Sequence, residues 1–162
     1  MFALIDDFKQ DLQEIVEDVI SSNDPLTISY ICNLMLNPPP ALSSGSIKLR
    51  WDVIYSTSDI DTKLEQTREI ADSIFSLGVF YQSSLKQEWR NELLVLGKHT
   101  YNIAAFYAFR QRESIQGFTF IELHNSFFRA VSGLSNYLHG SRNEAQKSIV
   151  LAFPDGSEKL IF

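Results

Sequence analysis

The chain has 162 residues and a mass of 18.5 kDa, which suits one domain and leaves too little sequence for two. Hydrophobic residues make up 44% and charged residues 21%, a globular composition rather than a disordered or fibrous one. The net charge of -6 disfavours a general nucleic-acid binder and a protein that coats anionic membranes. No apolar stretch approaches the roughly 20 residues of a membrane span, and the start of the chain predicts no signal peptide.

The net charge is concentrated in the first 24 residues, which hold seven acidic side chains against one lysine. Apolar residues recur there at spacings of three and four, which predicts an amphipathic helix over residues 4–22. The acidic side chains on its opposite side are Asp7, Asp11, Glu14 and Asp18. This acidic face is interpreted either as a solvated outer surface or as a docking surface for a basic protein partner.

A second helix is predicted over about residues 26–37, ending at a triple proline. Residues 37–46, rich in proline and serine, predict a loop that acts as a rigid spacer. The following segment, residues 47–56, fits two structures, because its apolar residues satisfy both the alternation of a strand and the spacing of a helix. The pattern leaves that choice open.

Three longer helices are predicted over residues 59–81, 85–111 and 118–139, with Gly117 marking the break before the last of them. The 85–111 helix has apolar residues on two faces, which is typical of a central helix. Gly97 and Ala104 lie on the face that also holds Tyr101, so we expect a neighbouring helix to approach closely there.

The C-terminal segment also fits two structures. Ser141 and Glu144 have the spacing of a capping box, which predicts a short helix through about Ala152. Alternatively, residues 149–153 pair with residues 159–162 in a hairpin. The sequence as a whole predicts a single all-α domain, residues 1–162, with six or seven helices around the central helix at about 85–111.

Two segments of the chain resemble segments of a known family. Residues 74–80, IFSLGVF, resemble its "LFLAGFF" helix end, and residues 92–101, ELLVLGKHTY, resemble its "YYIxMGxxAY" segment. Residues 30–35 and 123–128 resemble an early "YLVxLL" and an "ELAxxF". The family consists of uncharacterised, small, all-helical bacterial cytosolic proteins. The resemblance implies a helical fold, with helices at 47–56 and 142–152, and no activity; Glu92 and Leu93 replace the family's paired tyrosines.

The sequence carries no recognisable catalytic or metal motif, so we expect no catalytic residue, no metal and no cofactor. His99 and His124 lie on apolar lines of their helices, and we interpret each as a core or boundary side chain rather than a ligand or base. The single Cys32 cannot form an internal disulfide, which indicates a reducing compartment and a cytoplasmic location. Its apolar neighbours indicate an inert thiol.

Aromatic residues nearly encircle the 85–111 helix, and those outside the core-facing line are Phe106 and Phe109. We interpret this side as a candidate interface of a homodimer. The sequence thus favours a non-catalytic protein-interaction or assembly module that binds neither nucleic acid nor membrane. The alternative is an enzyme or small-ligand-binding protein. Its pocket would lie between the 61–81, 85–111 and 118–139 helices, with candidate residues Gly97, His99, Tyr101 and His124.

Overall fold

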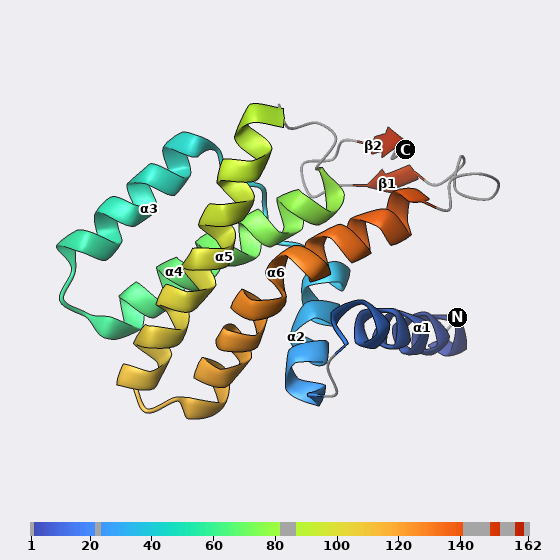
Figure 1. Cartoon of the computed structure of the whole chain (residues 1–162), viewed down its shortest axis with the longest axis horizontal. Helices are drawn as coiled ribbons and strands as arrows, with labels where there is room; N and C mark the ends of the chain where they lie inside the picture. Colours follow the sequence, from blue (N-terminus) through green and yellow to red (C-terminus); the bar gives the residue numbers. More distant parts are fainter. Residues whose placement is uncertain (1, 22–23, 82–86, 141–149, 153–157, 161–162) are drawn as a thin grey trace.

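The computed structural model describes residues 2–21, 24–81, 87–140, 150–152 and 158–160. Within them the chain forms six helices followed by a small β-hairpin (Figure 1). The elements are α1 (Phe2–Ile20), α2 (Pro25–Leu36), α3 (Ser44–Ser56), α4 (Ile60–Phe80), α5 (Gln87–Arg110), α6 (Ser114–Gly140), β1 (Val150–Ala152) and β2 (Glu158–Leu160). The all-α fold class predicted from the sequence is confirmed.

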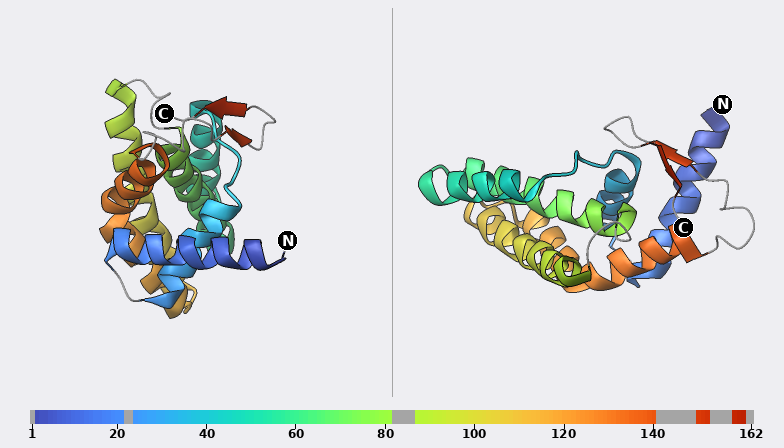
Figure 2. Two further views of the ribbon diagram at one scale, coloured as in Figure 1. Left: turned by 90° about the vertical axis from the view of Figure 1, so that its right-hand side faces the viewer. Right: turned by 90° about the horizontal axis from the view of Figure 1, so that it is seen from above.

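The helices are arranged in two layers, with α3 and α4 in one and α5 and α6 in the other (Figure 2). Helix α5 packs against both α4 and α6, which gives it the central position that its two apolar faces predict. Helices α1 and α2 pack against each other and against α6. The most completely buried segment is residues 70–80 of α4, where only Leu77 is partly exposed.

Large aromatic side chains fill the space where α4, α5 and α6 meet. The Phe127 ring of α6 makes an edge-on contact with Phe75 of α4, with ring centroids 5.8 Å apart. Tyr101 of α5 lies 6.0 Å from Phe127 and stacks on Phe120 at the same distance. All four side chains are fully buried. Their edge-on, tilted and stacked contacts are those that aromatic pairs prefer, so this cluster fixes how the three long helices cross.

Helix α1 shows the amphipathic pattern expected of the acidic segment. Leu12, Val16 and Ile20 are buried, and the side chain of Val19 packs against Gly133 of α6. On the opposite side, the acidic side chains described by the structure are exposed: Asp11, Glu14 and Asp18. The acidic face is therefore directed to solvent from Asp11 to Asp18, and the side chain of Asp7 lies outside the part that the structure describes.

Residues 47–56, for which the sequence pattern left strand and helix open, belong to α3. The helix begins earlier than that segment because the Ser43 hydroxyl caps it, accepting a hydrogen bond of 3.1 Å from the Ser46 N–H. Ile47 and Ile54 are buried, and Arg50 forms an ion pair with Glu69 of α4. The loop predicted at 37–46 is correspondingly shorter, since it ends at Ser43.

The predicted helix break at Gly117 is wrong, because α6 begins at Ser114 and continues through this glycine. The chain reverses five residues before this glycine, where Arg112 takes a φ of 61°. There the Glu113 N–H donates to the Ala108 carbonyl and the Arg112 N–H donates to the Phe109 carbonyl. These two bonds form a Schellman motif, a helix ending that normally places glycine where this chain has arginine.

The C-terminal residues described by the structure form the hairpin alternative. Strands β1 and β2 pair antiparallel, with Val150 opposite Leu160. The helix through Ala152, which the resemblance also implied, is therefore wrong for Val150–Ala152. Its expected start at Ser141 lies outside the described residues.

Candidate functional site

A carboxylate is buried at the centre of the fold and is shared by two tyrosines. The Tyr101 hydroxyl of α5 donates a hydrogen bond of 2.6 Å to Oδ1 of Asp72 on α4. The Tyr30 hydroxyl of α2 lies 2.7 and 2.8 Å from the two oxygens of the same carboxylate. Asp72 is buried, and Tyr101 is fully buried. Helices α2, α4 and α5 thus meet at one side chain.

Burial controls the titration of this cluster. It raises the pKa of Asp72 from 3.8 to about 6, although the hydrogen bonds from Tyr101 and Tyr30 and the positive charge of Arg68 act in the opposite direction. Burial and the Asp72 charge raise the pKa of both tyrosines far above 10.0. The tyrosines therefore stay protonated and act only as donors. The arrangement joins α2, α4 and α5 through one carboxylate.

Ser73, beside Asp72 on α4, binds the proline-rich loop. Its hydroxyl accepts a hydrogen bond of 3.1 Å from the Leu42 N–H and donates one of 3.3 Å to the Pro40 carbonyl. Sequence reasoning missed both polar residues, since hydrophobic spacing treats Asp72 and Ser73 as interruptions of an apolar helix. The signal that could have found them was a single carboxylate inside an otherwise apolar segment of α4.

The four residues predicted to line a pocket between the long helices differ in their exposure to solvent. Gly97 and Tyr101 face the core, whereas His99 is exposed and His124 is half-buried. A Cβ atom at Gly97 would lie 2.6 Å from Cγ2 of Ile74 and 2.7 Å from Cζ of Phe127. Side chains of α4 and α6 therefore fill the space next to Gly97, as the predicted close helix contact at this glycine requires.

The two histidines do lie next to each other on the seam between α5 and α6. Their ring centroids are 6.0 Å apart. Nδ1 of His124 lies 2.7 Å from the Lys98 carbonyl oxygen, and Nζ of Lys98 donates a hydrogen bond of 3.0 Å to the His124 carbonyl. This reciprocal pair of bonds holds His124 in place, close to the exposed imidazole of His99.

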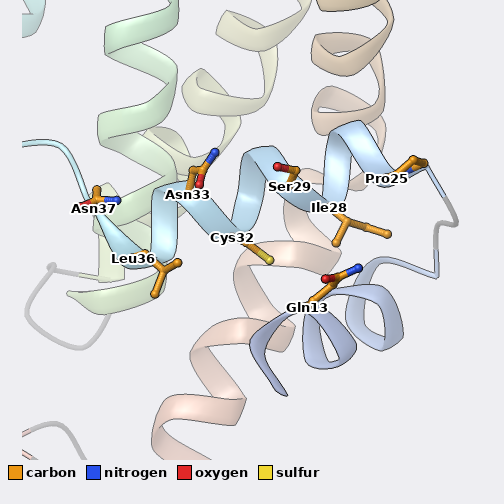
Figure 3. Close-up of a pocket in the computed structure, with 8 residues that line it drawn as sticks. All are labelled: Gln13, Pro25, Ile28, Ser29, Cys32, Asn33, Leu36 and Asn37. Atoms are coloured by element: carbon orange, nitrogen blue, oxygen red, sulfur yellow. The ribbon is translucent and has the colours of Figure 1, made fainter. Parts of the chain in front are cut away.

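A cavity of about 470 Å³ lies between α1 and α2, at a different place from the predicted pocket (Figure 3). Its lining residues are Gln13, Pro25, Ile28, Ser29, Cys32, Asn33, Leu36 and Asn37. Burial and the negative charge of Glu17 raise the pKa of the Cys32 thiol. A thiol that resists ionisation is a poor nucleophile, which agrees with the interpretation of Cys32 as inert.

The predicted interface residues lie at the end of the α5–α6 hairpin, among further exposed apolar side chains. Phe106 is 55% exposed and Phe109 38%, while Ile115 and Phe118 at the start of α6 are 69% and 63% exposed. The Phe109 and Phe118 rings meet edge-on with centroids 5.2 Å apart. We call the surface formed by Phe106, Phe109, Ile115 and Phe118 the aromatic tip.

Charged side chains surround the aromatic tip. The Arg110 guanidinium lies over the Phe106 ring, 5.5 Å from its centroid. Arg112 and Glu113, in the turn between the helices, are both exposed. Gly117 brings Phe109 close to α6, since a Cβ atom there would lie 2.7 Å from the Phe109 ring. The tip is thus an ordered surface with charges of both signs in its turn.

Among the described residues, no group of three or more His, Cys, Asp and Glu side chains is placed so that it could hold a metal ion. None of the helices, over the parts that the structure describes, combines the length and the apolar character needed to cross a membrane. No known protein family, curated protein or solved structure matches the chain.

Proposed function

We propose that this protein is a cytoplasmic, non-catalytic interaction module that assembles as a homodimer through the aromatic tip. The observation that carries the proposal is the exposure of four large apolar side chains in one place, two of them in direct ring contact. Aromatic residues and arginine are enriched at the centres of protein interfaces, and this surface holds both kinds.

A second copy of the chain is the occupant that the charges favour. In a two-fold interface the same surface is used by both subunits, so each charged group must meet its complement on the same patch. Arg112 and Glu113 are adjacent in the turn and opposite in sign. A two-fold axis near this turn brings the arginine of one copy toward the glutamate of the other, and this pairing favours the dimer over a random contact.

The distribution of negative charge is compatible with this assembly. Helix α1 lies on the right of the molecule in Figure 1, and the turn between α5 and α6 lies at the lower left. Two copies that meet at their tips keep the two acidic helices apart, beyond the roughly 8 Å over which charges act at physiological salt. The acidic face thereby stays accessible to the basic partner that its pattern suggests.

The test is static light scattering of the purified protein over micromolar to millimolar concentrations. We expect a dimer, and we expect Phe106→Ala and Ile115→Glu to shift it toward monomer at the same concentration. Tyr55→Ala is the matched control, because Tyr55 is also aromatic and 78% exposed but lies on α3. Thermal unfolding of each variant checks that the fold is retained.

Two results contradict the proposal. A wild-type protein that is monomeric throughout the concentration range refutes the dimer. A dimer that persists in both tip variants, or that dissociates equally in Tyr55→Ala, shows that the subunits meet elsewhere.

A further inference from the structure

We propose that His99 and His124 together bind one divalent transition-metal ion, of the class of Zn²⁺, Cu²⁺ and Ni²⁺, on the α5–α6 seam. The two rings come from different helices and lie 6.0 Å apart between centroids. His99 is exposed, so an ion reaches the pair directly from solvent. Imidazole nitrogen is a preferred ligand of these ions, whereas Mg²⁺ and Ca²⁺ prefer oxygen.

The hydrogen bond of His124 fixes which of its nitrogens faces a metal. Nδ1 lies 2.7 Å from the Lys98 carbonyl oxygen, which has no proton to give. Nδ1 therefore carries the proton and donates it, and in the neutral ring the lone pair is on Nε2. Metal-binding histidines characteristically have this arrangement, with one nitrogen bonded to a carbonyl or carboxylate and the other directed at the ion.

The separation of the rings suits a shared ion. With Zn–N bonds of about 2.0–2.1 Å and tetrahedral angles, two imidazole ligands of one ion have ring centroids roughly 5 Å apart. The observed 6.0 Å is close to this value, and the exposed His99 side chain has room to close the difference by a small rotation. His124 moves less, because its ring and its carbonyl are both bonded to Lys98.

The Lys98 ammonium is the positive charge nearest to this pair along α5, and it is already engaged. It donates to the His124 carbonyl and lies over the Phe128 ring, 5.9 Å from its centroid. Its charge weakens the binding of a cation, and two protein ligands leave the other coordination positions to water. We therefore infer a dissociation constant in the micromolar range, which is weaker than that of a structural zinc site. The occupancy of the site then follows the concentration of free metal ion.

The experiment is calorimetric titration of the full chain with ZnCl₂, with MgCl₂ as the contrasting ion. We expect one Zn²⁺ per chain, no comparable Mg²⁺ binding, and roughly tenfold or more weaker Zn²⁺ binding in His99→Gln. His139→Gln is the matched control, because it removes a histidine of α6 away from the pair and leaves the affinity unchanged. Nitrogen NMR of the imidazoles then shows the Zn²⁺-induced shift at Nε2 of His124 and not at Nδ1.

Zinc affinity that is the same in His99→Gln as in the wild type overturns the proposal, since the ion then binds at carboxylates such as those of α1. Absence of Zn²⁺ binding at millimolar concentration overturns it as well. Phe106→Ala separates this site from the dimer, because we expect that variant to lose association and to keep its zinc affinity.

Discussion

The hydroxyl of Tyr101 lies 2.6 Å from Oδ1 of Asp72, in the interior of the protein and between helices α4 and α5. A buried charge is costly unless it is hydrogen-bonded, and here two tyrosines supply the bonds. The core of this protein therefore contains a group of hydrogen bonds whose strength depends on the protonation of Asp72. The contribution of these hydrogen bonds to stability can therefore be measured by varying the pH.

Replacing Asp72 with asparagine changes how stability depends on pH. The folded-state pKa of about 6 is above the ordinary 3.8, so between about pH 4 and pH 6 the folded protein holds a proton that the unfolded chain has lost. The contribution of Asp72 to stability is therefore present at low pH, falls as the pH rises through this window and stays lower above it. Asparagine does not ionise and shows no such fall.

We expect the free energy of unfolding of Asp72→Asn, relative to wild type, to improve by roughly 2–3 kcal/mol between pH 4 and pH 8. Urea denaturation of both proteins at unit pH steps provides the comparison. The absolute difference also contains the cost of fitting an amide N–H against a tyrosine oxygen, but that cost is the same at every pH. A difference that does not change with pH contradicts the titration of Asp72.

Removing a tyrosine hydroxyl weakens the same cluster from the other side. Tyr101→Phe and Tyr30→Phe each delete a donor to the carboxylate, and we expect each to cost about 1–3 kcal/mol at pH 8. The loss is smaller at pH 4, where Asp72 is protonated and needs its donors less. Tyr55→Phe on the exposed face of α3 is the control and leaves stability unchanged. If each variant loses the same free energy of unfolding at pH 8 and at pH 4, the tyrosine hydroxyl stabilises the fold by packing and not through its hydrogen bond to Asp72.

A methyl group at position 97 has no room. A Cβ atom there would lie 2.6 Å from Ile74 and 2.7 Å from Phe127, so core side chains of two helices would have to move. We expect Gly97→Ala to lose about 1–3 kcal/mol and Gly97→Leu to lose more. At Gly45, the nearest atom to a Cβ is 3.9 Å away, so Gly45→Ala gains up to about 1 kcal/mol from helix propensity. Thermal melting of Gly97→Ala, Gly97→Leu and Gly45→Ala compares their stabilities. A Gly97→Ala protein as stable as wild type contradicts the close contact at Gly97.

The turn before α6 contains a residue that glycine would suit better. Arg112 has a φ of 61°, a conformation that costs an L-residue energy and glycine almost none. We expect Arg112→Gly to raise the unfolding free energy by about 0.5–1 kcal/mol. Arg112→Ala removes the same side chain but keeps the strained backbone, so no gain is expected from it. If both variants change stability equally, the arginine side chain rather than its backbone decides the effect.

Hydrophobic spacing predicted the helices because it reports which side of each helix is buried. Leu94, Tyr101 and Ala105 share an apolar line in the sequence, and all three are buried in α5. The sequence pattern predicted too late a start for α6, because it took Gly117 as the helix break. Gly117 instead lies inside α6 and makes room for the Phe109 ring. The turn itself has Arg112 at the positive-φ position where glycine is usual.

The candidate sites depend on contacts between helices, which no local pattern contains. Tyr30 and Asp72 are 42 residues apart, and neither stands out in its own segment. His99 and His124 become neighbours only because α5 and α6 reverse direction and pack side by side. The aromatic tip was more accessible to sequence reasoning, since Phe106 and Phe109 exceed what one core-facing line of α5 accommodates.

The hydrogen bonds of Ser73 change how the segment before α3 behaves. A run of three prolines between two helices looks like a place where the chain tolerates cutting or insertion. One hydroxyl, however, both receives the Leu42 N–H and donates to the Pro40 carbonyl, so this segment is attached to the most buried part of α4. An added loop or a protease site there strains the interior, and a fusion partner or label is better placed on the outer face of α3.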